Sequence, residues 1–354
     1  MNKKHISILL FLIGVIIIVV MIYNLGWQEI VNDIKNVGWW IIPIVLSRLL
    51  MYPLNTLSWR EVTFYNKEER KKVSYLRMLR LTISGYAINY ITPVMALGGE
   101  PYRIMAMKKD IGTKRAASSV LTYAMMHILS HFVFWIIGFI LLFIFFLYSG
   151  LEINSFRRII LTCGMVFIVI SIIAIIFIIR AYKYGVIKRF FSFLQRIPIL
   201  KNIVRKKLTS ERQQSIAETD QQFTELFNNH RSAFYKSLFY ETLSRIMSCT
   251  EIMLVMWAIA GVNSVSFVGA IIITTLTSLI ANIVFIFPMQ VGIREGGLSA
   301  SLACISSLGK QGVFVGMILR ISELIWIIIG MGMIKIKRFN NKQSFEYEQT
   351  NNNI

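Results

Sequence analysis

The segment Ile91-Thr-Pro-Val-Met-Ala-Leu-Gly-Gly-Glu100 places a proline, two adjacent glycines and a carboxylate inside an apolar region of the chain. Far downstream, Ile286-Phe-Pro-Met-Gln-Val-Gly-Ile-Arg-Glu295 has a similar arrangement. In both segments a glutamate follows a proline by seven residues, and glycine lies between them. Proline removes a helix hydrogen bond and glycine is entropically unfavourable in a helix, so both segments are expected to interrupt helices.

The rest of the sequence is typical of a membrane protein. Of its 354 residues, 55% are hydrophobic, and the mean hydropathy is +0.60. A helix needs roughly 20 apolar residues to cross a bilayer core. Six segments are long and apolar enough: 6–23, 39–59, 116–148, 159–179, 237–260 and 312–334. We therefore expect an all-α polytopic membrane protein with about six full transmembrane helices.

The formal net charge of +20 is concentrated in a few connections, at 60–80, at 108–115 and in the long basic loop 181–236. Loops rich in lysine and arginine stay in the cytoplasm. This rule places the three connections and both termini on the cytoplasmic side. The charge is thus expected to set membrane topology, and no nucleic-acid partner is expected.

This topology constrains the two interrupted regions, 81–107 and 266–308. The first has basic sequence on both sides, so it should enter from the cytoplasm and return there, whereas the second should enter and leave from the outside. Two re-entrant hairpins of opposite orientation would form inverted repeats. Non-helical backbone at this depth needs protein or water to satisfy its polar groups. A polar cavity is therefore predicted beside the helix-breaking residues, which are Pro93, Gly98, Gly99, Pro288, Gly292 and Gly296.

Charged side chains inside the apolar segments supply the candidate site. An ionisable group at mid-membrane costs about 2.5–3.5 kcal/mol on insertion scales, so it marks a function or a partner. The candidate substrate-binding residues are Arg48, Glu100, Arg103, Arg294, Glu295 and Arg320. The arginines suit phosphate because a guanidinium donates in pairs and keeps its charge. The glutamates could bind a cationic headgroup, couple protons or hold the arginines.

A simpler alternative is that these charges only join helices or cap half-helices. Glu241 and Arg245 are four residues apart and can pair with each other, and Arg320 and Glu323 also share a helical face. Arg48 has no local partner, so Glu100, Glu251 or Glu295 is expected to reach it through tertiary contact. The remaining intramembrane charges are Glu241, Arg245, Glu251 and Glu323.

Two longer motifs extend the interrupted segments: Asn89-Tyr-Ile-Thr-Pro-Val-Met-Ala-Leu-Gly-Gly-Glu-Pro-Tyr-Arg103, and Phe287-Pro followed by Gly292 and Glu295-Gly-Gly297. Together they resemble the transmembrane region of lysylphosphatidylglycerol synthases and related stand-alone flippase-like proteins, over about 3–338. The resemblance implies a multi-pass plasma-membrane protein of a bacterium or archaeon that moves an anionic or aminoacylated phospholipid, or a lipid-linked headgroup, between leaflets. Its partner is then a membrane lipid.

Two alternatives to transport stay open. The two-part synthases attach lysine to phosphatidylglycerol with a soluble domain, which protects against cationic peptide antibiotics. Here the membrane region 1–338 is followed by a polar tail, 339–354, that is expected to be disordered, so lysyl transfer is not expected of this chain alone. The second alternative is a non-transporting scaffold for a lipid-modifying enzyme.

No cofactor or metal site is expected. His127 and His131 are four residues apart but lack the adjacent glutamate of a zinc-protease helix. A polar packing or proton-handling role suits them better. Aromatic and basic residues alternate in the loop 181–236, which suits either a segment lying on an anionic leaflet or an ordinary juxtamembrane loop.

Overall fold

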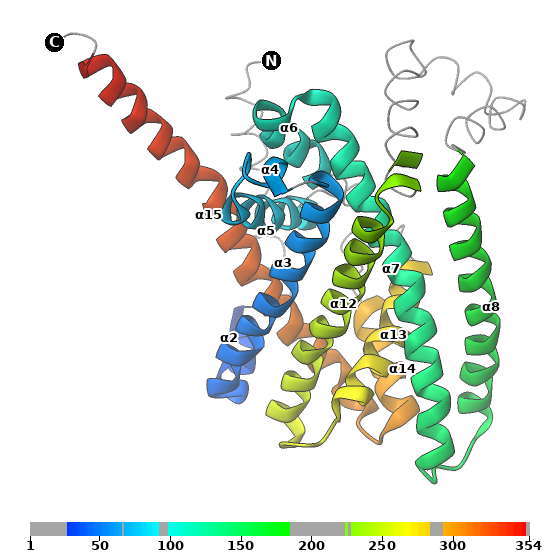
Figure 1. The fold of residues 1–354 in the computed structure, drawn as a ribbon. Helices are drawn as coiled ribbons and strands as arrows, with labels where there is room; N and C mark the ends of the chain where they lie inside the picture. The colour runs from blue at the N-terminus through cyan, green and yellow to red at the C-terminus, as the bar shows by residue number, and fades with distance from the viewer. Residues whose placement is uncertain are drawn as a thin grey trace, which may run out of the picture.

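The computed structural model describes residues 27–65, 67–91, 98–184, 224–225, 228–283 and 293–351. Within these ranges the regular elements are all helices, which confirms the all-α class (Figure 1). In chain order they are α2 (Trp27–Val37), η1 (Gly38–Trp40), α3 (Ile41–Thr63), α4 (Lys67–Arg70), α5 (Tyr75–Ile91), α6 (Gly99–Ile111), α7 (Thr113–Tyr148), α8 (Ser155–Tyr184), α12 (Arg231–Ala260), α13 (Phe267–Ile283), α14 (Ile293–Ile305), η3 (Gly309–Gln311) and α15 (Gly312–Asn351).

Five described segments are long and apolar enough to cross a membrane: Lys35–Thr63, Thr113–Tyr148, Ser155–Arg180, Arg231–Ala260 and Gly309–Ile334. They correspond to five of the six spans expected from the sequence, and the chain is a multi-pass membrane protein. The expected first span, 6–23, lies outside the described residues. Figure 1 shows α7, α8 and α12 running along the long dimension of the molecule, with α15 inclined to them on the side of α3 and α5.

The two interrupted regions each contain two helices. α5 and α6 flank residues 92–97, and α13 and α14 flank residues 284–292; neither intervening stretch is among the described residues. Figure 1 places α5 and α6 in one half of the molecule and α13 and α14 in the other. The depth of these helix pairs in a bilayer stays a prediction.

Glycine allows the chain to turn sharply at helix ends. Gly112, with φ +79°, ends α6 and precedes α7, and Gly261, with φ +92°, ends α12. L-residues with a side chain rarely adopt these angles. At the other end of the sequence α15 runs through Asn351, and so includes much of the tail for which composition favours disorder. Most of the basic loop, 185–223, lies outside the described residues.

Two apolar cores lie on either side of a polar layer. One core packs α3, α5, α6, α7 and α12 around Trp59, Met78 and Met126. The other packs α7, α12, α13, α14 and α15 around Leu142 and Leu298. On each helix shared by the two cores, polar and charged side chains occupy the positions between them. A polar layer thus separates the two cores, and further buried charges, such as Glu251 and Arg320, lie on the helices of the second core.

An ion pair fixes α4, which lies outside the membrane-spanning segments, against the first turn of α7. Arg115 donates two hydrogen bonds to the Glu69 carboxylate, at 2.8 and 2.6 Å, and a third to the carbonyl oxygen of Thr63 at 3.1 Å. The bonds from Arg115 lower the pKa of Glu69 below its ordinary value. Glu69 therefore keeps its charge, and the connection between α3 and α5 stays anchored at neutral pH.

Glycine in α15 generates the first prediction. A Cβ added at Gly330 would lie 2.6 Å from the Ala87 Cβ and 3.0 Å from the Ile83 carbonyl oxygen, both on α5. Gly330→Ala should therefore destabilise the protein by about 1–3 kcal/mol through overpacking. Thermal unfolding of the detergent-purified protein, followed by tryptophan fluorescence, measures the effect.

Gly332→Ala is the matched control on the same helix. A Cβ there has nothing within 4 Å, so this change should be neutral or stabilising by up to about 1 kcal/mol, since alanine favours a helix. Equal unfolding temperatures for the two variants would contradict the close packing of α15 on α5.

Candidate functional site

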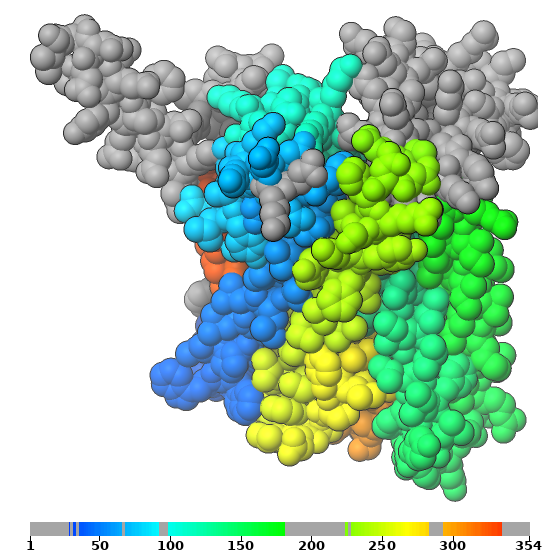
Figure 2. All heavy atoms as spheres, in the orientation of Figure 1, coloured from blue at the N-terminus to red at the C-terminus, as the bar shows by residue number. Residues whose placement is uncertain are grey.

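Polar side chains join α3 to α12 at three levels. The hydroxyl oxygens of Ser58 and Ser237 lie 2.9 Å apart, and Ser244 donates to the side-chain oxygen of Asn55. Further along, Arg48 Nε donates to Glu251 Oε1 at 2.9 Å. Because the two helices run antiparallel, these contacts follow one another along a single interface. Figure 2 shows the two helices packed side by side on the visible face.

Arg48 and Glu251, which form the last of these contacts, belong to a cluster of six charged residues. Arg48 also reaches Glu323 Oε1 at 3.4 Å, Arg294 pairs with the same Glu323, and Arg320 Nε donates to Glu295 Oε1 at 2.5 Å. The arginines are Arg48, Arg294 and Arg320, and the glutamates are Glu251, Glu295 and Glu323. We call these six residues the charge cluster. They come from α3, α12, α14 and α15, and their formal charges cancel.

The members of the charge cluster differ in accessibility. The side chains of Arg48 and Arg320 are 6% and 5% exposed, whereas that of Arg294 is 26% exposed. Arg320 Nη2 is buried and has no hydrogen-bond partner among the described residues. An ionised group in a dry interior needs both a counter-charge and filled hydrogen bonds. The cluster thus contains one accessible guanidinium and one open donor.

The sequence predicted part of this arrangement. Of the partners expected for Arg48, Glu251 contacts it; its second partner is Glu323, while Glu295 holds Arg320 instead. Arg320 and Glu323 share a helix, but each pairs with a different residue. Gly316 on α15 makes room for Glu295, since a Cβ there would lie 2.8 Å from the Glu295 Cγ.

Arg103 lies in a separate aromatic pocket. Its guanidinium carbon lies 5.7 Å from the ring centre of Trp59, 5.0 Å from that of Tyr86 and 5.4 Å from that of Tyr123. The same side chain donates to the carbonyl oxygens of Leu81 and Thr82, and it is 2% exposed. Stacking on rings stabilises a desolvated cation. Arg103 therefore fastens α6 to α3, α5 and α7, away from the charge cluster.

Glu100 and the glycines before it lie where α5 meets α6. Asn89 on α5 accepts a hydrogen bond from the Gly99 amide at 2.6 Å and donates to Glu100 Oε1 at 3.1 Å. A side chain at Gly99 would collide with the Gly85 carbonyl oxygen. Gly98 precedes α6 and Gly296 lies in α14. The other predicted helix-breaking residues, Pro93, Pro288 and Gly292, lie outside the described residues.

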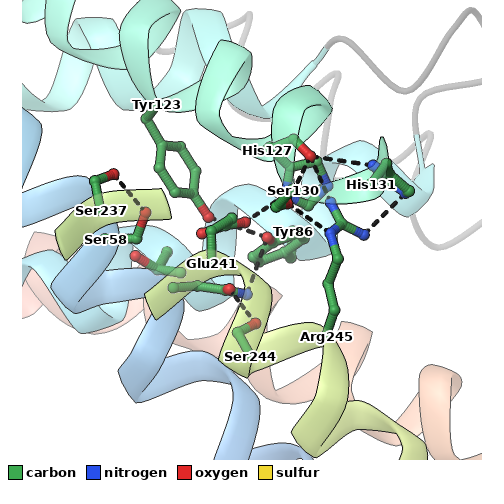
Figure 3. A network of polar contacts seen from close by, with 12 residues as sticks. Ser58, Tyr86, Tyr123, His127, Ser130, His131, Ser237, Glu241, Ser244 and Arg245 are labelled. Carbon is green, nitrogen blue, oxygen red and sulfur yellow. Dashed lines mark hydrogen bonds and ion pairs between the residues drawn. The ribbon is translucent and has the colours of Figure 1, made fainter. Parts of the chain in front are cut away.

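A third polar group lies between α7 and α12 (Figure 3). The expected direct pair of Glu241 with Arg245 is wrong: Glu241 contacts His127 Nδ1, and Arg245 turns to α7. Arg245 donates to Ser130 Oγ at 2.7 Å, to His131 Nε2 at 2.8 Å and to the His127 carbonyl oxygen at 2.8 Å. Acceptors on the neighbouring helix thus replace the partner one turn away on the same helix.

Sequence reasoning missed the tyrosines of this region. Tyr86 receives a hydrogen bond from Asn55 at 3.0 Å, and its hydroxyl oxygen lies 3.1 Å from that of Tyr123. These residues join α3, α5 and α7 at the level of the polar layer. Tyrosine is common in membrane proteins, so its identity alone gives no signal. Among the described residues, no three His, Cys, Asp or Glu side chains are grouped so as to hold a metal ion.

An apolar pocket of about 130 Å³ lies between α7, α8, α13 and α14. Phe139, Cys163, Leu279 and Ser301 are among its lining residues, none of which is charged. The pocket and the charge cluster therefore offer different chemistry, one suited to hydrocarbon and the other to ions.

The Arg320–Glu295 pair generates the second prediction. Arg320→Met or Glu295→Met alone should destabilise the protein by about 3–5 kcal/mol, because each leaves a buried charge without its partner. The double variant should recover about 1–3 kcal/mol of the summed loss. Thermal unfolding in detergent of all four proteins measures this coupling. Strictly additive losses would contradict a direct interaction between the two side chains.

Comparison with known proteins agrees with this architecture. The family model described as the lysylphosphatidylglycerol synthase TM region matches residues 7–332. No curated protein and no solved structure matches the chain. The matched region contains four of the five described spans, all but the last two residues of the fifth, the charge cluster and both interrupted regions. The chain belongs to the family of the lysylphosphatidylglycerol synthase transmembrane region.

Proposed function

We propose that the chain moves a lipid between the leaflets of the membrane, and that the charge cluster receives the lipid's phosphate. Two features of the charge cluster together carry this proposal: the guanidinium of Arg294 is partly exposed, and Arg320 has a buried donor without a hydrogen-bond partner among the described residues. Buried arginines that only joined helices would need neither feature. The cargo is an anionic or aminoacylated phospholipid, or a lipid-linked headgroup.

Phosphate binding at this cluster is an exchange of partners. A phosphate entering beside Arg294 takes the place of Glu323 as its acceptor, and Glu323 keeps Arg48 as a counter-charge. A planar guanidinium can donate two parallel hydrogen bonds to phosphate oxygens. The exchange replaces water around the headgroup with fixed donors, so the phosphate avoids bare hydrocarbon.

The lipid tails require different surroundings. α8 carries large exposed apolar side chains, including Ile173 and Phe177, and the apolar pocket lies between α8 and the α13–α14 pair. A tail can therefore stay in hydrocarbon or in the pocket while the headgroup occupies the charge cluster. Rocking of one half against the other would then open the cluster to each leaflet in turn.

This function places the chain in the plasma membrane of a bacterium or archaeon, with both termini in the cytoplasm. The support is the family and the distribution of basic residues between the spans. A lipid-modifying enzyme that produces the cargo, and so provides resistance to cationic peptide antibiotics, is the partner this function calls for.

Arg294→Gln tests the proposal. Loss of a hydrogen bond to a charged group is worth about 1.5–3 kcal/mol, which corresponds to roughly 10- to 100-fold slower translocation. The fold should survive, since Glu323 retains Arg48. The measurement is the rate at which fluorescent phosphatidylglycerol, lysylphosphatidylglycerol or a polyprenyl-phosphate lipid reaches the opposite leaflet of vesicles that contain the purified protein.

Arg158→Gln is the control, because Arg158 is exposed on α8 and carries the same charge. It should leave the rate unchanged. Wild-type rates equal to those of empty vesicles for all three lipids would overturn the proposal. If the purified chain with lysyl-tRNA instead produced lysylphosphatidylglycerol, the chain would be a lysyltransferase.

A further inference from the structure

The polar group between α7 and α12 contains a sealed carboxylate beside an accessible imidazole. The Glu241 side chain is 0% exposed, while that of its partner His127 is 35% exposed. Glu241 Oε1 contacts His127 Nδ1, and Glu241 Oε2 is buried without a hydrogen bond among the described residues. Figure 3 shows the two side chains pointing toward one another from neighbouring helices. A proton can therefore reach the carboxylate through the ring.

The neighbouring hydrogen bonds assign the proton on His131. Arg245 is always a donor, so His131 Nε2 must accept its bond at 2.8 Å. The proton of His131 then lies on Nδ1, which donates to the His127 carbonyl oxygen at 3.1 Å. His131 is neutral in this arrangement. The exchangeable proton of the group accordingly lies between His127 and Glu241.

This proton has two states available. The contact between Glu241 Oε1 and His127 Nδ1 needs one proton between the two atoms. A second proton gives either an imidazolium beside the carboxylate or a neutral imidazole beside a neutral carboxyl group, and in both cases the pair loses its single negative charge. The neutral carboxyl is accessible because the Glu241 side chain is fully buried, and loss of water disfavours its anion.

The groups around Glu241 are mostly donors or cations. Arg245 lies on α12, the same helix as Glu241, and Arg103 stacks on the nearby Tyr86 and Tyr123 rings. The hydroxyls of Ser58 and Tyr123 also face the carboxylate. Arg103 also pairs with Glu100 at 4.0 Å, so the charges of the two arginines and the two glutamates balance, and a second proton makes the group positive. A second proton is therefore better tolerated when an anion is bound nearby.

We propose that Glu241 and His127 form a proton site that couples lipid movement to proton movement in the same direction. The inference rests on the proposed lipid translocation. The site and the charge cluster share α12, on which Glu241 is ten residues from Glu251, or about 15 Å along the helix. An anionic headgroup and a proton then favour each other's binding. One proton moving with one anionic lipid carries no net charge.

The same proton changes the contact between α7 and α12. Arg245 holds α7 with three hydrogen bonds, one of which needs a neutral His131. A proton added to His127, which lies beside His131, repels the Arg245 guanidinium because both groups then carry positive charge. Loading the site therefore loosens α7 from α12 and gives the two halves freedom to rock.

The test uses phosphatidylcholine vesicles that contain the full chain, a trace of fluorescent phosphatidylglycerol and a pH-sensitive dye in the lumen. Potassium and valinomycin on both sides hold the membrane potential at zero. With one proton per lipid, a gradient of one pH unit should sustain about a tenfold ratio of labelled lipid between the leaflets. Movement of the lipid should also change the lumenal pH.

Glu241→Gln should reduce the leaflet ratio to about one and abolish the change in lumenal pH. His127→Asn is the second variant, because asparagine can still donate toward Glu241 but takes up no proton. Glu68→Gln, an exposed glutamate on α4, is the control and should behave as wild type. Equal unfolding temperatures establish that the variants are folded.

Three results would overturn the coupling. A wild-type protein that equilibrates the lipid but sustains no ratio under the gradient refutes coupling and leaves translocation standing. A tenfold ratio retained in both variants refutes the assigned site. A wild-type protein that moves no lipid refutes translocation itself, and the coupling with it.

Discussion

The contact of Arg48 with Glu251 and Glu323 is the constraint on which the arrangement of the helices depends. It joins α3, α12 and α15 at one level of the molecule, beside the apolar core of α7, α12, α13, α14 and α15. A buried charge that loses its partner costs several kcal/mol, whereas apolar neighbours can be exchanged at smaller cost. Among the possible packings of these three helices, only those that bring the three side chains together are therefore favourable. The remaining pairs of the charge cluster build outward from this point.

Hydropathy alone predicts the class of fold and most of the spans, because the requirement for about 20 apolar residues is a property of each segment by itself. The presence of intramembrane charges is equally local. Which side chains pair with these charges, however, depends on how the other helices pack. Glu241 and Arg245 have the spacing of a helical ion pair, yet α7 presents His127 and Ser130 at the same level, and these contacts prevail.

The position of Arg103 illustrates the same limit. Its pocket takes one ring from each of α3, α5 and α7, and no spacing in the sequence relates these rings. The sequence identified Arg103 as a buried charge near a helix break, but it grouped that charge with Arg48 and Arg294. In the structure, Arg48 and Arg294 share Glu323, whereas Arg103 is held by rings and backbone carbonyls. Cross-helix contacts of this kind become visible only once the packing is known.

Adjacent residues of opposite charge, Arg294 and Glu295, connect α14 to α15 through partners three residues apart, Glu323 and Arg320. This pattern fixes the register of the two helices. If α14 slid along α15 by about one turn, or 5.4 Å, toward Arg320, Arg294 would lie opposite a like charge. Glu323 would then lose its contact with Arg294. α14 and α15 are thereby prevented from shearing past each other, and they must travel as a single rigid unit in any rearrangement that keeps these pairs intact.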